Sequence, residues 1–320
     1  MLRVSPIVSV LISIWLETLI YGINIAAYVF SLYILLKRPS VNLVVLILST
    51  ALFVSATGHM AINLCRLVQG YIQPPTKAAM LVFLYDLTVK TNVAKQYFLV
   101  MVNLFSDILL TWRVYMVWER NWKVTTIPAT LCAATFTSGI VTAIYESIVQ
   151  PGQTIFLKRI SHWASAQFSL SLAMNLTTTL LIASRIWYVT REVREFSPEK
   201  TRAYKWVVVV LVESASVAAF AQIVQLAFYE SKFPGIFFIS DGVVQVVTMA
   251  PLIIIVLVGV RGTNKGGVLG TSYHTSETAM SDMRFDSHIA VELQGQSRST
   301  HGDLSAEGGS TVHINKGYAV

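Results

Sequence analysis

The sequence has few charged residues and almost no cysteine. Of its 320 residues only 13% are Asp, Glu, Lys or Arg, whereas 54% are hydrophobic and 2 are cysteines. Ordinary globular chains carry about 25% charged residues, so this composition argues against a soluble domain. Cys65 and Cys132 lie in apolar stretches, where thiols act more often as small apolar fillers than as a disulfide. A disulfide-dependent secreted fold is therefore not expected.

Catalytic and metal-binding motifs are also missing. The sequence contains no G-x-S-x-G, no H-E-x-x-H and no C-x-x-C. Only His59 and His162 precede the C-terminal tail, too few for a His-rich open zinc site, which needs about three protein ligands. No lysine occurs between residues 236 and 260, which excludes a retinal Schiff base at the usual position. We therefore predict no enzyme activity and no cofactor or metal.

Long apolar stretches dominate what is present. A hydrocarbon core about 30 Å thick needs roughly 20 apolar residues of helix to cross it. Seven stretches meet that length, at residues 7–36, 41–68, 93–118, 124–149, 163–189, 206–228 and 236–260. Because each backbone N–H and C=O in lipid must be satisfied within its own segment, we predict an all-α, polytopic bundle of seven transmembrane helices. The shorter apolar piece 80–87 is predicted to be an interfacial helix or an outward extension of the third span.

Composition divides the chain into two parts. Residues 1–262 form the predicted transmembrane domain and leave no room for a folded soluble domain. Residues 263–320 are rich in Ser, Thr and Gly, with few aromatics. Such a segment cannot bury enough apolar surface to offset chain entropy, so a disordered tail is predicted. Its hydroxyls are acceptors for phosphorylation, although a merely solubilising tail explains the composition equally well.

The basic residues between the spans fall into two unequal sets. The richer set has eleven members: Lys37, Arg38, Arg120, Lys123, Arg191, Arg194, Lys200, Arg202, Lys205, Arg261 and Lys265. The poorer set has six: Arg3, Lys77, Lys90, Lys158, Arg159 and Lys232. Because basic loops face the cytoplasm, we predict a plasma-membrane protein with its N-terminus outside and its C-terminus cytoplasmic. This asymmetry also accounts for the net charge of +7, so we predict the lipid bilayer, and no nucleic acid, as partner. Loop 190–204 and the tail are predicted to contact a cytoplasmic protein.

Ionisable residues inside the spans are candidate functional sites, because a charge at mid-membrane costs at least about 2.5–3.5 kcal/mol on insertion scales. Asp107 on the third span and Glu213 on the sixth come to similar depth, with Arg113 near enough to join them. We predict that both carboxylates face the bundle interior. The group acts either as hydrogen-bonding glue between helices or as a state-dependent switch or proton site.

A second group of ionisable residues lies in the outer halves of the spans. Glu17 and His59 are on the first two spans and Asp241 is on the seventh. These three are predicted to line an outer-half pocket for a small-molecule ligand. Glu146 and Asp241 are close enough to helix ends to be hydrated. Arg113 and Arg185 lie about one turn from inner ends, where a long side chain can snorkel to the interface.

Three stretches carry a resemblance to a known family: residues 106–118 followed by Asn121-Trp122, residues 212–214, and residues 250–255 with Gly259. Together they resemble the large seven-helix membrane protein family of basidiomycete fungi. That family's third helix typically carries an acidic residue six before an Arg, then a Trp and an Asn-Trp turn. Asp107, Arg113 and Trp118 hold the first three places here, whereas Trp112 replaces the expected Tyr. The resemblance covers most of residues 20–262 and implies a class, since the family has no established ligand or activity.

Three functions fit these observations. The helix count and orientation also resemble G-protein-coupled receptors, although the sequence has no D-R-Y after the third span and no N-P-x-x-Y in the seventh. The leading prediction is a receptor-like sensor of a small ligand that signals through rearrangement of the third and sixth spans. A proton- or ion-coupled transporter or channel is the alternative, against which the absence of visible repeats weighs. A non-catalytic membrane scaffold is the second alternative.

Overall fold

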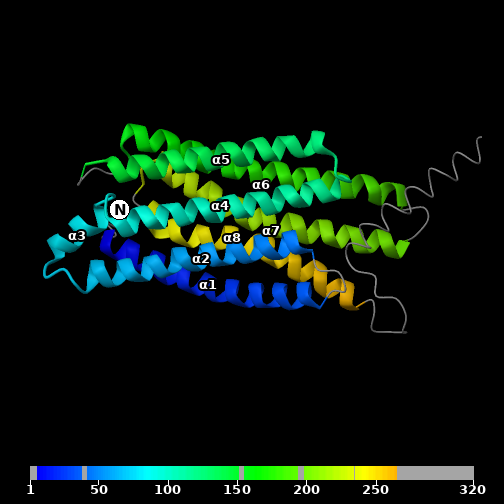
Figure 1. The fold of residues 1–320 in the computed structure, drawn as a ribbon, viewed down its shortest axis with the longest axis horizontal. Coiled ribbons are helices and arrows are strands. Elements are labelled where there is room, and N and C mark those ends of the chain that lie inside the picture. Colours follow the sequence, from blue (N-terminus) through cyan, green and yellow to red (C-terminus); the bar gives the residue numbers. More distant parts are fainter. Residues whose placement is uncertain (1–5, 38–41, 151–154, 194–197, 234, 265–320) are drawn as a thin grey trace, which may run out of the picture. The chain divides into compact units, whose positions relative to one another are not determined.

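Helices make up nearly all of the described chain. The computed structural model describes residues 6–37, 42–150, 155–193, 198–233 and 235–264, which belong to one compact unit. The helices are α1 (Pro6–Leu36), α2 (Leu43–Tyr71), α3 (Lys77–Tyr85), α4 (Lys90–Val117), α5 (Trp122–Ile148), α6 (Lys158–Val193), α7 (Pro198–Glu230) and α8 (Ile236–Asn264). All except α3 are long and apolar enough to cross a membrane (Figure 1). The predicted all-α bundle of seven spans is confirmed, and the chain is a multi-pass integral membrane protein.

The short helix α3 resolves an open question from the sequence. It is a separate helix of nine residues rather than an extension of the following span. Thr76 caps its first turn, because its side chain accepts a hydrogen bond from Ala79 N at 3.2 Å. Asp86 ends it, and the Asp86 carboxylate accepts hydrogen bonds from Thr88 N at 2.9 Å and Thr88 Oγ1 at 2.7 Å. These contacts turn the chain between α3 and α4.

The last helix, α8, is the most enclosed span. In the 18-residue apolar stretch of α8, 61% of the residues are buried, compared with 28–33% in the corresponding stretches of the other six spans. It packs against α1, α2, α4 and α7 (Figure 1). Its side chain Val244 joins Leu52 of α2 and Leu109 of α4 in one buried apolar cluster. A movement of α8 therefore changes its contacts with four neighbouring helices.

The interior of the bundle contains many polar side chains beside the apolar clusters, and many large apolar side chains face outward. Asn24, Gln245 and Thr248 are each 0% exposed, whereas Leu19 and Phe220 are 68% and 70% exposed. Lipid tails solvate apolar side chains, so association between membrane helices depends on close packing and interhelical hydrogen bonds. The polar interior therefore identifies the contacts that hold these helices together.

Several predictions concern residues that the structure does not describe. The Ser/Thr-rich tail lies outside the described residues, apart from Thr263 and Asn264 at the end of α8. The charged loop 190–204 is described only as the end of α6 and the start of α7, with residues 194–197 outside. Both cysteines are described and free, with Cys132 buried and Cys65 exposed. The filler role predicted for the thiols therefore fits Cys132 only.

Candidate functional site

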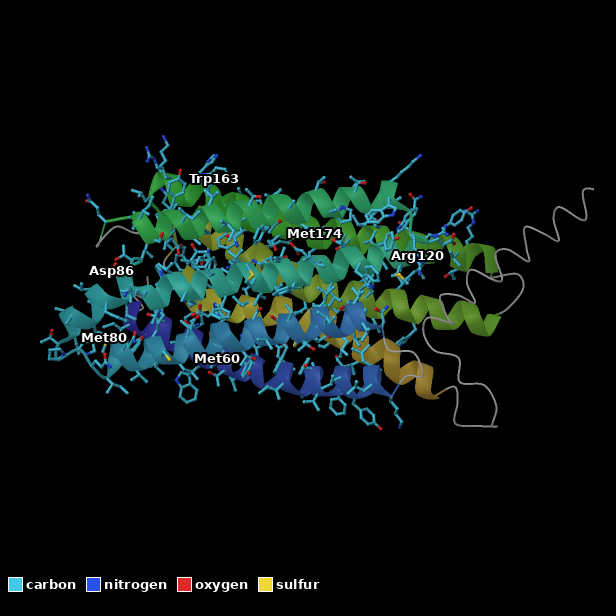
Figure 2. All side chains as sticks on the ribbon, viewed as in Figure 1. Met60, Met80, Asp86, Arg120, Trp163 and Met174 are labelled. Atoms are coloured by element: carbon cyan, nitrogen blue, oxygen red, sulfur yellow. The ribbon has the colours of Figure 1, made fainter. Side chains whose placement is uncertain are left out.

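A group of buried polar side chains joins the helices in the half of the bundle nearer α3. We call it the polar cluster, and its members are Glu17, His59, Asn63, Arg66, Lys95, Glu146, Asp241 and Gln245. They come from α1, α2, α4, α5 and α8. Figure 2 shows Met80 and Asp86 at the α3 end of the bundle and Arg120 at the opposite end. The cluster lies toward the α3 end, because the Arg66 guanidinium is 5.6 Å from the ring of Phe83 in α3.

Glu17 of α1 is the best-connected member of the polar cluster. It is 0% exposed, and its Oε1 lies 2.7 Å from His59 Nδ1 and accepts a hydrogen bond from Gln245 Nε2 at 3.0 Å. Its Oε2 accepts from Asn63 Nδ2 at 2.5 Å. Hydrogen bonds to an ionised carboxylate are shorter and stronger than neutral ones, so these donors make a buried acid tolerable. One carboxylate therefore ties α1 to both α2 and α8.

Gln245 extends the connection between α1 and α8. Its Oε1 and its backbone oxygen accept hydrogen bonds from Asn24 Nδ2 at 2.8 Å and 3.0 Å. Further along the same pair of helices, Ser31 Oγ donates to the Leu252 carbonyl at 3.1 Å. Interhelical hydrogen bonds of this kind contribute about 0.6 kcal/mol each on average in a membrane. Several in a row hold α8 in a defined register on α1.

Asp241 joins α8 to two other helices. It is 5% exposed and accepts hydrogen bonds from Ser13 Oγ of α1 at 3.2 Å and from Lys95 Nζ of α4 at 2.9 Å. The Lys95 contact is an ion pair whose lysine side chain is 21% exposed. Breaking a buried ion pair by removing one partner costs about 3–5 kcal/mol. The ion pair therefore connects α4 to α8, and replacing one of its partners should destabilise the bundle.

Two members of the polar cluster lack such close partners. Arg66 is 7% exposed, with Nη1 at 3.5 Å from Thr91 Oγ1 and its guanidinium 5.6 Å from the centroid of the Phe83 ring. Glu146 is also 7% exposed and forms no hydrogen bond with the described part of the chain. The positive charges of Lys95 and Arg66 interact with it electrostatically. Within the cluster, the contacts are therefore uneven.

A small cavity with a mixed apolar and polar lining lies deeper in the bundle, between α4, α6, α7 and α8. Its polar lining comprises Asn103, Ser171, Gln222 and Gln225. Gln222 Nε2 donates to Ser171 Oγ at 2.9 Å. The volume open to the centres of water-sized spheres is about 20 Å³, and a water needs roughly 10–15 Å³ by this measure. The cavity is large enough for a water molecule and far too small for an organic ligand.

The prediction that both carboxylates face the bundle interior holds for Asp107 and is wrong for Glu213. Asp107 is buried at 5% exposure and its Oδ2 has no partner among the described residues, whereas Glu213 is exposed on α7. Gln222 of α7 faces the interior, and Glu213 precedes it by nine residues. At about 100° per residue this places the two side chains on opposite sides of the helix. Equal depth therefore did not imply a shared face.

Arg113 bonds to α8 instead of either carboxylate. Its Nη2 donates to the Pro251 carbonyl at 2.7 Å, while its Nη1 has no partner in the described ranges. Pro251 lies within α8, where a proline removes one backbone hydrogen bond and favours a kink. Arg113 thus links α4 to α8 beside the proline, below the level of the polar cluster.

The three residues predicted to line an outer-half pocket, Glu17, His59 and Asp241, are all buried members of the polar cluster, and the pocket itself stays a prediction. Glu17 contacts His59 directly, and Asp241 is held by Ser13, one turn before Glu17 on the same helix. Asp241 and Glu146, which the sequence predicted to be hydrated near helix ends, are buried at 5% and 7% exposure. Glu146 lies two residues before the end of α5, and Asp241 lies five residues after the start of α8.

Four cluster members were missed from the sequence: Asn63, Arg66, Lys95 and Gln245. Lys95 follows the start of α4 by five residues, so a lysine one turn inside a span was the available signal. Asn63, Arg66 and Gln245 lie in apolar stretches, where any residue able to bond across helices deserves weight.

Comparisons of the chain with protein-family models, with curated proteins and with solved structures gave no match. Within the described ranges no group of three or more His, Cys, Asp or Glu side chains is placed to hold a metal ion. The polar cluster and the contacts of α8 are therefore the features of the structure that bear on its function.

Proposed function

We propose that this membrane protein is a receptor-like sensor in which α8 carries a signal from the polar cluster to the opposite end of the bundle. The small ligand is detected at the α3 end, where Glu17, His59 and Asp241 meet. The protein is non-catalytic in this proposal. The basic-residue asymmetry supports placing the α3 end outside the plasma membrane and the other end in the cytoplasm.

The observation that carries the proposal is the way α8 is held. At the α3 end it is bonded through Asp241 and Gln245 to α1 and α4, and further along Arg113 of α4 bonds the Pro251 carbonyl. A hydrogen bond or an ion pair of this kind can be broken when another group competes for one of its partners. A ligand that competes for Asp241 or Lys95 would free one segment of α8 on one side of its proline.

The moving pair in this proposal differs from the one predicted from the sequence. The predicted rearrangement of the third and sixth spans, α4 and α7, required Asp107 and Glu213 both to face the interior, and Glu213 is exposed. α4 keeps its role because it supplies both Lys95 and Arg113 to α8. The proposal therefore pairs α4 with α8. Kinship with the basidiomycete seven-helix family remains part of the proposal, supported by residues 106–118, 212–214 and 250–255.

The variant Lys95→Met tests the coupling between the two ends. It removes the charge paired with Asp241 and keeps much of the methylene stem. We expect faster backbone amide exchange in α8 beyond Pro251, because the far segment loses its anchored partner. Lys90→Met is the matched control, since Lys90 is exposed on the same helix. Exchange that rises only around Asp241, or not at all, would show that the ends are uncoupled and would refute the proposal.

A proton- or ion-coupled transporter is the second candidate. It is favoured by buried ionisable or amide side chains at successive depths: Asp241, Glu17, Gln222 and Asp107. Such residues in spans often mark proton relays or ion pathways. Purified protein in liposomes with an imposed pH gradient separates the two candidates. Proton flux or solute accumulation that empty liposomes lack would establish transport, whereas a sensor should produce neither.

A further inference from the structure

Two side-chain amides line the small cavity without a hydrogen-bond partner. Gln225 of α7 is 6% exposed and Asn103 of α4 is half-buried. Neither side chain forms a hydrogen bond with another described residue. The neighbouring amide of Gln222, by contrast, donates to Ser171 Oγ at 2.9 Å and accepts from Asn175 Nδ2 at 3.0 Å. Burying an amide without a hydrogen bond is costly, and surrounding lipid supplies no partner, so the two amides need one inside the cavity.

The walls of the cavity differ in their chemistry. Its polar groups come from α4, α6 and α7, whereas α8 contributes only valines, at positions 243, 244 and 247. The Ser171 hydroxyl on the polar side accepts from Gln222 and still has its own hydrogen to donate. Each free amide offers two N–H donors and one carbonyl acceptor. An occupant of the cavity therefore meets donors and acceptors from three helices and apolar side chains from the fourth.

Water is the occupant that fits both the size and the chemistry of the cavity. There is room for a water molecule and none for an organic ligand. A buried water typically makes about three hydrogen bonds to polar groups that are otherwise unsatisfied, and the two amides and the hydroxyl supply them. A metal cation fits less well, because the described lining contains no carboxylate to balance its charge inside the membrane.

The cavity lies between the two polar links that join α4 to α8. Along α4, Asn103 falls between Lys95 and Arg113, which make those links. Along α8, the valines of the apolar wall fall between Asp241 and Pro251, which receive them. Because the α8 side chains at the cavity are apolar, a shift of α8 past this wall breaks no side-chain hydrogen bond there.

We infer that the cavity binds an internal water molecule, which Asn103, Gln225 and Ser171 hold in place. The water joins α4 to α6 and α7, and water-mediated hydrogen bonds are enthalpically nearly as good as direct ones. In one respect this deepens the proposed sensor and rests on it. When the link between Lys95 and Asp241 opens, α8 moves against the three water-linked helices, and the same movement lets the bound water exchange faster.

Hydroxyl-radical footprinting of the full chain in lipid nanodiscs detects such a water. X-rays convert bound water into radicals that label the side chains beside it, and a prior pulse of oxygen-18 water shows how fast bound water is replaced. Phe168 lines the cavity and should be labelled. Phe220 of α7 is 70% exposed on the outside of the bundle and is the internal control. It should stay unlabelled, because the hydrocarbon core holds no water.

Three variants test which side chains hold the water. Asn103→Leu replaces an amide by an apolar group of similar size and should abolish the Phe168 label. Asn103→Ser is the matched control, because it keeps a hydroxyl, leaves more room and should retain the label. Val247→Leu fills the cavity from its apolar wall and should also lose the label, which covers the case in which Asn103→Leu does not fold. A wild-type Phe168 label no stronger than that of Phe220, or a label unchanged in both leucine variants, would overturn the water site.

The remaining outcomes separate the water site from the sensor. A Phe168 label that falls when sodium replaces choline at constant ionic strength would show that a metal cation occupies the cavity, and would overturn the water site. Lys95→Met should speed the replacement of bound water by oxygen-18 water. A label that behaves as expected in the cavity variants, with an exchange rate unchanged by Lys95→Met, would support the water site and refute the sensor. A missing label together with faster amide exchange in α8 of Lys95→Met would overturn the water site and leave the sensor standing.

Discussion

Replacing Glu17 by leucine is the sharpest test of the polar cluster as a structural element. The variant removes the acceptor shared by His59, Asn63 and Gln245, and leaves those donors facing an apolar side chain. Interhelical hydrogen bonds in membranes contribute about 0.6 kcal/mol on average and up to roughly 1.7 kcal/mol. Three lost contacts therefore predict a loss of about 2–5 kcal/mol in the free energy of unfolding.

The assay for this variant is reversible unfolding in bicelles, followed by steric trapping or by a denaturant titration. Glu213→Leu is the matched control, because it makes the same chemical change on the exposed side of α7. It should leave stability unchanged or raise it, since the new side chain suits lipid better than a carboxylate. Equal stabilities for Glu17→Leu and the wild type would refute the reasoning, because they would mean that Glu17 connects nothing. If Glu213→Leu lowered the free energy of unfolding as much as Glu17→Leu, Glu213 would not be on the exposed side of α7.

Three further changes give distinct expectations. Gly139→Ala should destabilise the bundle by about 1–3 kcal/mol, because its new Cβ would lie 2.9 Å from a Val100 methyl, whereas Gly22→Ala meets nothing within 4 Å and should be neutral in the same unfolding assay. Arg113→Met removes the bond to the Pro251 carbonyl and should speed amide exchange in the α8 segment that follows the proline, with unchanged exchange there counting against the link. Glu119→Gln breaks an ion pair with Arg185 in which the glutamate is 47% exposed. The free energy of unfolding should therefore fall by less than about 1 kcal/mol. A larger loss would mean that this ion pair stabilises the bundle more than exposed pairs do.

Hydropathy determined the spans because the physical requirement is local. Each spanning helix satisfies its own backbone groups, so length and apolar content identify it without knowledge of its neighbours. The ends moved by a few residues, as for α6, which begins at Lys158 rather than at residue 163. Polar residues at the boundary tolerate either helix or loop. The short stretch after Thr76 stayed ambiguous because nine residues can extend a span or stand alone.

The facing of side chains was harder to predict. α7 is apolar on nearly every side around Glu213, with valines at 208–210 and 212, and such a helix has little amphipathic asymmetry to mark its buried face. Glu213 and Asp107 lie at similar depth, but the Glu213 side chain points to the outer side of α7 and Asp107 points inward. Glu17 and His59 were singled out correctly as neighbours in one half of the bundle, since ionisable residues in spans seldom lack partners.

The role of Gln245 shows what single-residue reasoning leaves out. Gln245 carries no charge, and the sequence analysis singled out only ionisable residues within the spans. In the structure its side chain bonds Glu17 and Asn24 at once. The partners lie 221 and 228 residues away along the chain, so only the packing of α8 on α1 brings them into range.

The distance between α4 and α8 at the end opposite α3 tests the central claim most directly. Spin labels at Val117 and Leu257, introduced after replacement of Cys65 and Cys132, allow it to be measured by pulsed electron resonance in nanodiscs. Asp241→Asn weakens the Lys95 contact at the α3 end without touching the labelled end. The account predicts a shifted or broadened distance distribution in this variant relative to the labelled parent. A distribution identical to that of the parent would contradict the claim that α8 couples the polar cluster to the far end of the bundle.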